Sequence, residues 1–134
     1  MSRSLWPLQQ AVYAALTSGS PAPVSAPVYD AVPQDSAYPY VQIGDDLTVA
    51  DFSPVAGEGD DVDFHIHGWS RYAGKKEVLE MMAEIKAALQ GARLAVPGWQ
   101  IAGLRETFST VILEPDGKTR HSVQRFRVRL RKAS

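Results

Sequence analysis

The chain has 134 residues, a formal net charge of −1 at neutral pH and no cysteine. This length suits one hydrophobic core, so we expect residues 1–134 to form a single domain. The lack of cysteine excludes a disulfide framework and a thiolate zinc site, and the near-neutral charge gives no global reason to expect nucleic acid or an acidic membrane as partner.

The amino-terminal residues carry no targeting signal that we recognise. Met1 to Ser4 are not followed by a continuous apolar segment, and no run approaches the roughly 20 apolar residues that a membrane span needs. We therefore expect a soluble protein that is not exported and does not contact a membrane.

A first amphipathic helix is predicted from residue 5. Ser4 is of a type that caps helices, and Gly19 is of a type that ends them. The apolar residues between them share one helical face, and they are Leu5, Leu8, Val12, Ala15 and Leu16.

Two extended segments follow, and then an acidic stretch. Residues 28–30 predict a short strand and residues 39–44 a second one. Residues 45–61 are acidic and contain Gly and Pro, which indicates a mobile loop or an exposed hairpin with solvated carboxylates. The stretch contains Asp45, Asp46, Asp51, Asp60 and Asp61.

The middle of the chain holds the clearest strand and helix signals. Residues 62–67 alternate apolar and polar side chains, which predicts a strand with one buried face. The inward residues are Val62, Phe64 and Ile66. Residues 69–74 predict a turn, residues 78–89 predict an amphipathic helix, and Gly91 is positioned to cap it.

The last part of the sequence predicts a β-hairpin. Residues 101–113 form its first strand, with a bulge near Gly103, and residues 114–118 its turn. The final strand has one apolar face, and its other face carries a row of arginines, Arg125, Arg127, Arg129 and Arg131. The predicted fold class is α+β, a mainly antiparallel sheet packed with two amphipathic helices.

Few residues indicate chemistry. His65 and His67 lie on the same side of one strand, a spacing that some metal sites use, but it is also the spacing of polar residues on a solvated sheet face. The sequence has no GxSxG elbow and no phosphate-binding GxxxxGK[ST] loop. We therefore predict no catalytic residue, cofactor or metal.

The arginine row has two interpretations. It forms a solvated sheet face, with partners such as Glu106 or Glu114 across the hairpin, or it binds phosphate or an acidic protein surface. Phosphate contacts add affinity without sequence selection, so the row would contact DNA without reading it.

The order and spacing of these segments resemble a family of short tail-completion or tail-terminator proteins of long-tailed bacteriophages, prophages and gene transfer agents. The resemblance depends on the helix near Leu5, Val28-Tyr29-Asp30 with Pro33, Tyr38-Pro39-Tyr40-Val41 with Ile43-Gly44, Ile66, Trp69-Ser70, Gly74, the helix at 77–89 and the arginine-bearing last strand. None of these segments is a catalytic signature.

The resemblance implies a structural role without enzymatic activity. Copies of such a protein assemble in the cytoplasm into a ring, typically of six, that caps the tail tube and contacts the head connector at the head–tail junction. A closed ring requires two different patches on each copy. We hypothesise that the acidic residues of 45–61 and the arginine row supply them, or that the arginines contact DNA in the lumen. A small metal-dependent enzyme built around His65 and His67, or a DNA-contacting module, are the alternatives.

Overall fold

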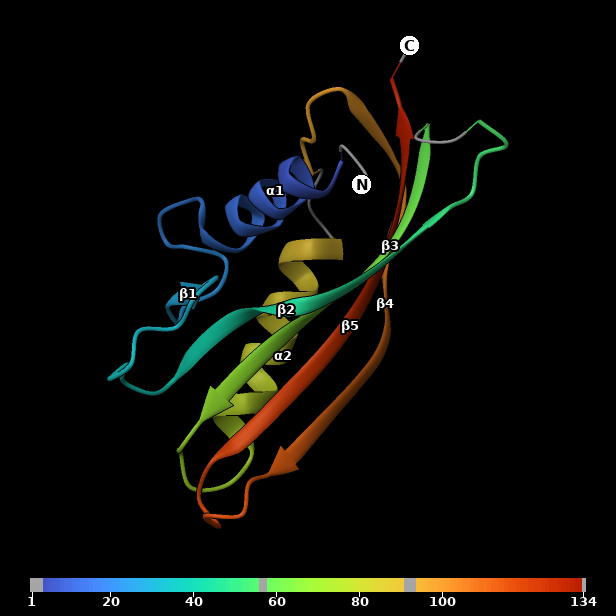
Figure 1. Cartoon of the computed structure of the whole chain (residues 1–134). Coiled ribbons are helices and arrows are strands. Elements are labelled where there is room, and N and C mark those ends of the chain that lie inside the picture. Colours follow the sequence, from blue (N-terminus) through green and yellow to red (C-terminus); the bar gives the residue numbers. More distant parts are fainter. Residues whose placement is uncertain (1–3, 56–57, 91–93, 134) are drawn as a thin grey trace.

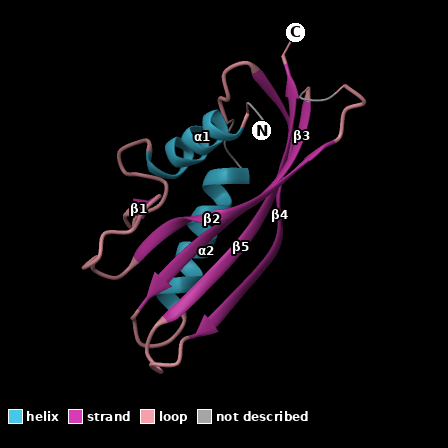
Figure 2. Cartoon of the chain, viewed as in Figure 1, coloured by secondary structure: helices cyan, strands magenta, loops and turns pink. Residues whose placement is uncertain are grey.

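A computed structural model describes residues 4–55, 58–90 and 94–133. The elements are α1 (Leu5–Thr17), β1 (Val28–Tyr29), β2 (Tyr40–Asp51), β3 (Gly59–Ser70), α2 (Lys76–Gln90), β4 (Trp99–Leu113) and β5 (Arg120–Lys132). One twisted sheet carries both helices on the same face (Figures 1 and 2). The predicted α+β class is confirmed. Neither described helix is long and apolar enough to cross a membrane.

The five strands lie in the order β1-β2-β3-β5-β4. Only β1 pairs in parallel, with β2, and every other neighbouring pair is antiparallel. Strand β3 therefore lies at the centre between β2 and β5, while β1 and β4 form opposite edges. The sheet joins segments that are about 60 residues apart in the sequence, such as Phe64 and Phe126.

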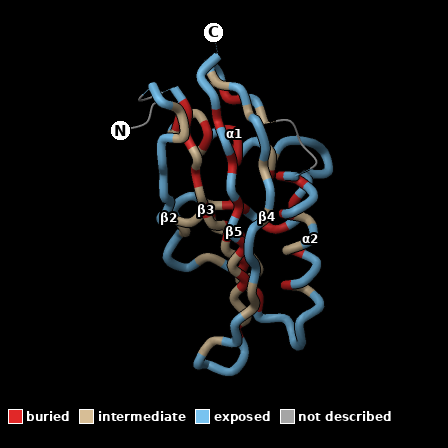
Figure 3. Tube along the Cα trace, turned by 90° about the vertical axis from the view of Figure 1, so that its right-hand side faces the viewer, coloured by how far each residue is buried: buried red, intermediate tan, exposed pale blue. Residues whose placement is uncertain are grey.

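The core lies between the helices and one face of the sheet. Alternate residues of β3 and β5 point into it, and the Phe64 and Phe126 rings stack there at a centroid distance of 5.7 Å. Figure 3 shows this alternation as red and paler segments along the strands. The fully buried core side chains include Val62, Ile66, Val128 and Leu130 of the sheet and Leu16, Ile85 and Leu89 of the helices. The predicted inward residues of 62–67 are confirmed, and so is the single apolar face of the final strand.

The strands β2 and β3 are longer than the sequence predicts. Residues 45–51 belong to β2, and residues 59–61 and 69–70 belong to β3. The hairpin alternative for the acidic stretch is thus confirmed, and the predicted turn at 69–74 begins two residues too early. The reason is non-local, because β3 stays paired with β5 as far as Ser70 opposite Arg120. The cap predicted at Gly91 lies outside the described residues.

The expected solvation of Asp60 is wrong. Asp60 shares the core-facing parity of Val62 and is fully buried under the first turn of α1, where the Ser4 hydroxyl donates to its carboxylate. Ser4 occupies the predicted N-cap position, but its side chain makes no bond to a helix amide. The hydrogen bond from Ser4 to Asp60 thus joins α1 to the sheet. It also offsets the cost of burying the Asp60 carboxylate, which is high when no hydrogen bond is accepted.

The final hairpin forms as predicted. Glu114 N donates to Thr119 O at 2.8 Å, and Gly117 adopts a φ of 75° that suits glycine. The expected bulge appears as a register shift between Ile101 and Gly103. A second shift, between Glu106 and Phe108, was not predicted.

Gly68 of β3 is a position where the sheet leaves no room for a side chain. A Cβ there would lie 2.5 Å from the Ser122 hydroxyl oxygen on β5, directly across the pair. We expect Gly68→Ala to lower the free energy of unfolding by about 1 to 3 kcal/mol, the usual cost of overpacking a core. Urea unfolding measures this.

The matched control is the double variant Gly68→Ala with Ser122→Ala. It removes the colliding oxygen and leaves the Ser122 Cβ at an ordinary 3.8 Å. We expect Ser122→Ala to restore much of the lost stability in the Gly68→Ala background. Equal destabilisation in the single and double variants would contradict the steric explanation.

Candidate functional site

The face of the sheet away from the helices, here called the open face, carries most of the residues singled out from the sequence. Their side chains point there because they alternate with the core residues along β3 and β5. The open face contains Asp61, Asp63, His65, His67 and Trp69 from β3, and His121, Val123, Arg125, Arg127, Arg129 and Arg131 from β5. The predicted arginine row is confirmed as one face of the last strand.

Two of the arginines form paired hydrogen bonds with aspartates of the same chain. Arg127 donates to both Asp63 oxygens at 2.9 and 3.1 Å, and Arg129 donates to both Asp61 oxygens at 2.7 and 2.8 Å. These bonds lower the pKa of both carboxyls and raise the pKa of both guanidinium groups. Bidentate geometry fixes the direction of each side chain as well as its charge.

The expected arginine partners on β4 and in the hairpin are not the ones that the structure shows. Glu106 accepts from Gln124 at 2.8 Å, and Glu114 lies 3.1 Å from His121. The aspartates of β3 take their place because β5 lies between β3 and β4, so that its arginines reach either neighbour. Only β3 offers carboxylates at the matching positions of the open face.

The remaining predicted contact residues are spread over the surface. Asp45, Asp46 and Asp51 are exposed along β2. Arg125 donates to His65 Nε2 at 3.3 Å and lies over the Phe108 ring, whereas Arg131 points toward Phe52. Asp61 therefore forms an ion pair with the arginine row of its own chain. The three aspartates of β2 form no described ion pair with that row.

A chain of hydrogen bonds links three residues at the other end of the open face. His121 Nδ1 lies 3.1 Å from Glu114 Oε1, and His121 Nε2 lies 2.7 Å from His67 Nδ1. Because a neutral imidazole has one donor and one acceptor, His121 donates to Glu114 and accepts from His67. The Trp69 ring stacks on His121 at 3.7 Å. Burial lowers the pKa of both imidazoles, and for His121 the Glu114 carboxylate opposes this effect.

This arrangement does not favour the metal-dependent enzyme. The rings of His65 and His67 are 6.4 Å apart, and His67 directs one nitrogen to His121. Among the described residues, no group of three or more His, Cys, Asp or Glu side chains is placed to hold a metal ion. The two histidines instead lie on the open face, as the alternation predicts.

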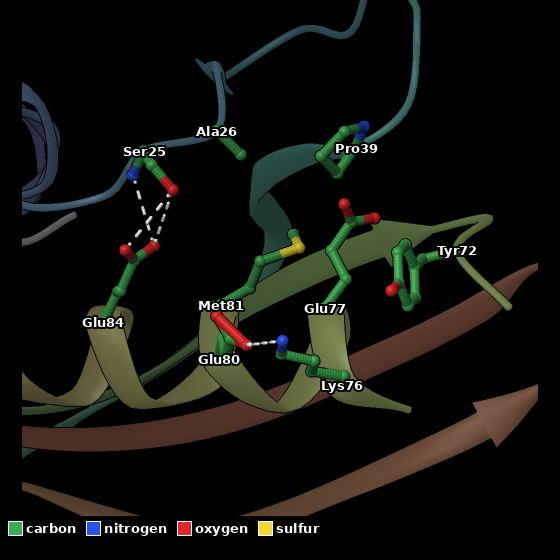
Figure 4. A pocket seen from close by; sticks show the side chains of 9 residues that line it. All are labelled: Ser25, Ala26, Pro39, Tyr72, Lys76, Glu77, Glu80, Met81 and Glu84. Atoms are coloured by element: carbon green, nitrogen blue, oxygen red, sulfur yellow. Dashed lines mark hydrogen bonds and ion pairs between the residues drawn. The ribbon is translucent and has the colours of Figure 1, made fainter. Parts of the chain in front are cut away.

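A cleft of about 290 Å³ lies between α2 and the segment before β2, and Figure 4 shows the residues around it. Its three glutamates already have partners. Glu84 accepts from the Ser25 amide and hydroxyl, Glu77 accepts from Ser70, and Glu80 lies 4.0 Å from Lys76. The bonds between Ser25 and Glu84 therefore fasten the proline-containing segment to α2.

Two features of the open face were missed from the sequence. One is the bond between His67 and His121, and the other is Arg105, which lies opposite Arg127 in the β4–β5 pair. Both depend on which strands are neighbours. The only sequence signal was parity, since Trp69, His67 and His121 all occupy outward positions of their strands.

The fold and the open face define a small α+β protein whose distinctive side chains form hydrogen bonds and ion pairs within the chain. The family model described as "Tail completion protein gp17" matches residues 10–131. The chain therefore belongs to the tail completion protein gp17 family, and the resemblance inferred from the sequence is confirmed. Its role is structural, in a phage-like tail.

Solved structures agree with this assignment. A chain of the structure titled "Virion of native gene transfer agent (GTA) particle" is 30% identical to this one, with a TM-score of 0.84. The match covers 98% of this chain and 99% of the other. A comparison with curated protein sequences gives no match.

The pKa shift of His67 leads to a prediction on pH. An unfolded imidazole takes up its proton near pH 6.5, whereas the pKa of folded His67 is lower, so the unfolded state binds more protons below about pH 6.5. Stability contributed by the neutral histidine is thus lost as the pH falls. We expect His67→Gln to reduce the difference between the unfolding free energies at pH 7 and pH 5.

The control is His65→Gln, which leaves the Glu114–His121–His67 chain intact and removes only a smaller cause of the lowered His67 pKa, so it should change the pH dependence less. The bidentate aspartates are present in both variants, so their loss of stability at lower pH cancels in the comparison. An unchanged pH dependence in the His67 variant would contradict the prediction.

Proposed function

We propose that copies of this chain form a ring, typically of six, that caps the finished tail tube and joins it to the head connector. The whole chain, residues 1–134, acts as one tail-terminator domain without enzymatic activity. The ring assembles in the cytoplasm and becomes part of the phage-like particle at the head–tail junction. The partners are further copies of the chain, the tail tube protein and connector proteins.

The observation that carries this proposal is the match to a chain of a gene transfer agent virion. It extends over nearly the full length of both chains, so no additional domain is needed to explain the likeness. The fold supports the proposal because the sheet has two different edges, β1–β2 on one side and β4 on the other. A closed ring requires contacts between unlike patches of that kind.

The predicted contact residues enter the proposal with different weights. Arg125, Arg127, Arg129 and Arg131, with Asp45, Asp46, Asp51, Asp60 and Asp61, remain the candidate subunit or DNA contacts. Asp45, Asp46 and Asp51 are exposed and best placed for a neighbouring copy. Asp61 is bound to Arg129, and Asp60 is buried, so both act first within their own chain.

Exposed Arg125 and Arg131 are the members of the row that no carboxylate of the described chain binds. They suit non-specific contact with DNA in the lumen.

Electron microscopy of particles from a producing strain that lacks this gene tests the proposal. We expect tails of abnormal length and heads without attached tails, because nothing would cap the tube or join it to the connector. Re-expression of the chain should restore complete particles. Normal particles in the deletion strain would refute the proposed role.

The same strain tests the arginine row. We expect Arg127→Glu with Arg129→Glu to lower the yield of complete particles at least tenfold, by reversing charges at the proposed contacts. This double variant also breaks the ion pairs with Asp61 and Asp63. A quadruple variant that adds Asp61→Arg and Asp63→Arg re-forms those pairs with opposite polarity.

Particle counts for the two variants separate the explanations. If the arginines contact a neighbouring copy or DNA, the quadruple variant stays defective, as we expect. Recovery of full yield would show that the arginines act only within their own chain, and would contradict their assignment as contact residues. Thermal unfolding of each purified variant shows whether it is folded.

A further inference from the structure

We propose that neighbouring copies join through their sheet edges, with the outer edge of β2 at Leu47–Asp51 pairing antiparallel with the edge strand β4 of the next copy. This inference rests on the proposed ring and names the surfaces that would build it. The partner at both edges is a further copy of this chain.

The outer edge of β2 is open over half its length. β1 pairs only with Val41 and Gln42, and no described strand pairs with that edge beyond them. Phe52 N donates to Gly59 O on β3. Since bonding direction alternates along an antiparallel strand, the amides of Asp51, Val49 and Leu47 point away from β3.

These residues also expose apolar side chains. Leu47 and Val49 are 41% and 38% exposed, although they point toward the helix-covered side of the sheet. The described helices pack mainly on the other strands, and β2 has few contacts with either of them. Exposed apolar side chains beside unpaired amides are suited to strand addition.

The second open edge is β4, the last strand of the sheet order. Glu106 N donates to Gln90 Oε1 of α2 at 3.1 Å, which shows that its amide points away from β5. At the hairpin end, Glu114 N bonds to Thr119 O, so by alternation Leu113, Val111 and Ser109 point their amides outward. Gln90 satisfies one outward amide of β4, and no described strand pairs with this edge.

The strand directions are compatible with this union. Within one chain β2 is antiparallel to β3, β3 to β5 and β5 to β4, so β2 and β4 have opposite directions. A rotated copy placed beside β4 in the same sheet would therefore present its β2 antiparallel to it. Each contact joins the β2 edge of one copy to the β4 edge of the next. Every copy therefore has one edge for each of its two neighbours, which is the condition for closing a ring.

The charges at the two edges are complementary. Arg105 on β4 lies opposite Arg127, whose guanidinium is already bound to Asp63, and no described carboxylate pairs with Arg105. On β2, Asp46 has no ion pair among the described residues. Attraction between Arg105 at one edge and an unpaired acid at the other would favour this orientation of the copies.

Cysteine cross-linking in assembled particles tests the proposal, since the natural chain has no cysteine. Val49→Cys is combined in separate variants with Ile101→Cys, Leu104→Cys or Ser109→Cys, and each is expressed in the deletion strain. The four positions share the helix-covered side of the sheet but lie on opposite edges of one chain. A disulfide needs Cα atoms within about 7 Å, so bonds form only between paired copies.

We expect at least one variant to give a ladder of covalent oligomers on a non-reducing gel after mild oxidation. The control pairs Val49→Cys with Tyr13→Cys on the outer face of α1, and should stay monomeric. Complete particles without a ladder in any of the three variants would overturn edge pairing and leave the ring proposal intact. Normal particles in the uncomplemented deletion strain would instead refute the ring proposal itself.

Proline substitution provides a second measurement. Val49→Pro removes an amide that points outward, a position where an edge strand accepts proline. Val49→Ala keeps the amide and loses the side chain. If the amide bonds across the interface, Val49→Pro lowers the yield of complete particles at least tenfold more than Val49→Ala. Equal yields from two equally folded variants would contradict the role of the β2 edge.

Discussion

The pairing of β3 with β5 is the constraint on which the rest of the structure depends. It joins residues 59–70 to residues 120–131 without a bulge. A shift of one residue in either strand would exchange its buried and exposed side chains. The same register therefore places Phe64 beside Phe126 in the core, and Asp63 beside Arg127 on the open face. Core packing and the ion pairs therefore favour the same register of β3 with β5.

Local patterns were sufficient to predict most of the elements. The alternation at 62–67, the helical spacing at 78–89 and the turn chemistry of Gly117 each act within a few residues, and each prediction was confirmed. The outward face of Arg125, Arg127, Arg129 and Arg131 followed from the same alternation. The fold class needed only these elements and one hairpin, because two amphipathic helices must cover an apolar sheet face.

The misses share one physical cause, which is contact between segments far apart in the sequence. Asp60 occurs in an acidic stretch, and its burial depends on the first turn of α1, where Ser4 lies above it. The partners of Arg127 and Arg129 depend on β5 lying between β3 and β4, an order that no local pattern contains. For the same reason His121 could not be placed beside His67.

The ion pairs also determine which arginines have no carboxylate partner. Arg127 and Arg129 are bound to aspartates of their own chain, whereas Arg105, Arg125 and Arg131 have no ion pair with a carboxylate of the described residues. If copies join edge to edge, the sheets form a closed wall with the helices on one side. The helical layer is bulkier and needs the larger outer circumference, so the open face would line the lumen. Arginines without carboxylate partners would then face the path of DNA, where contacts with phosphate bind without selecting sequence.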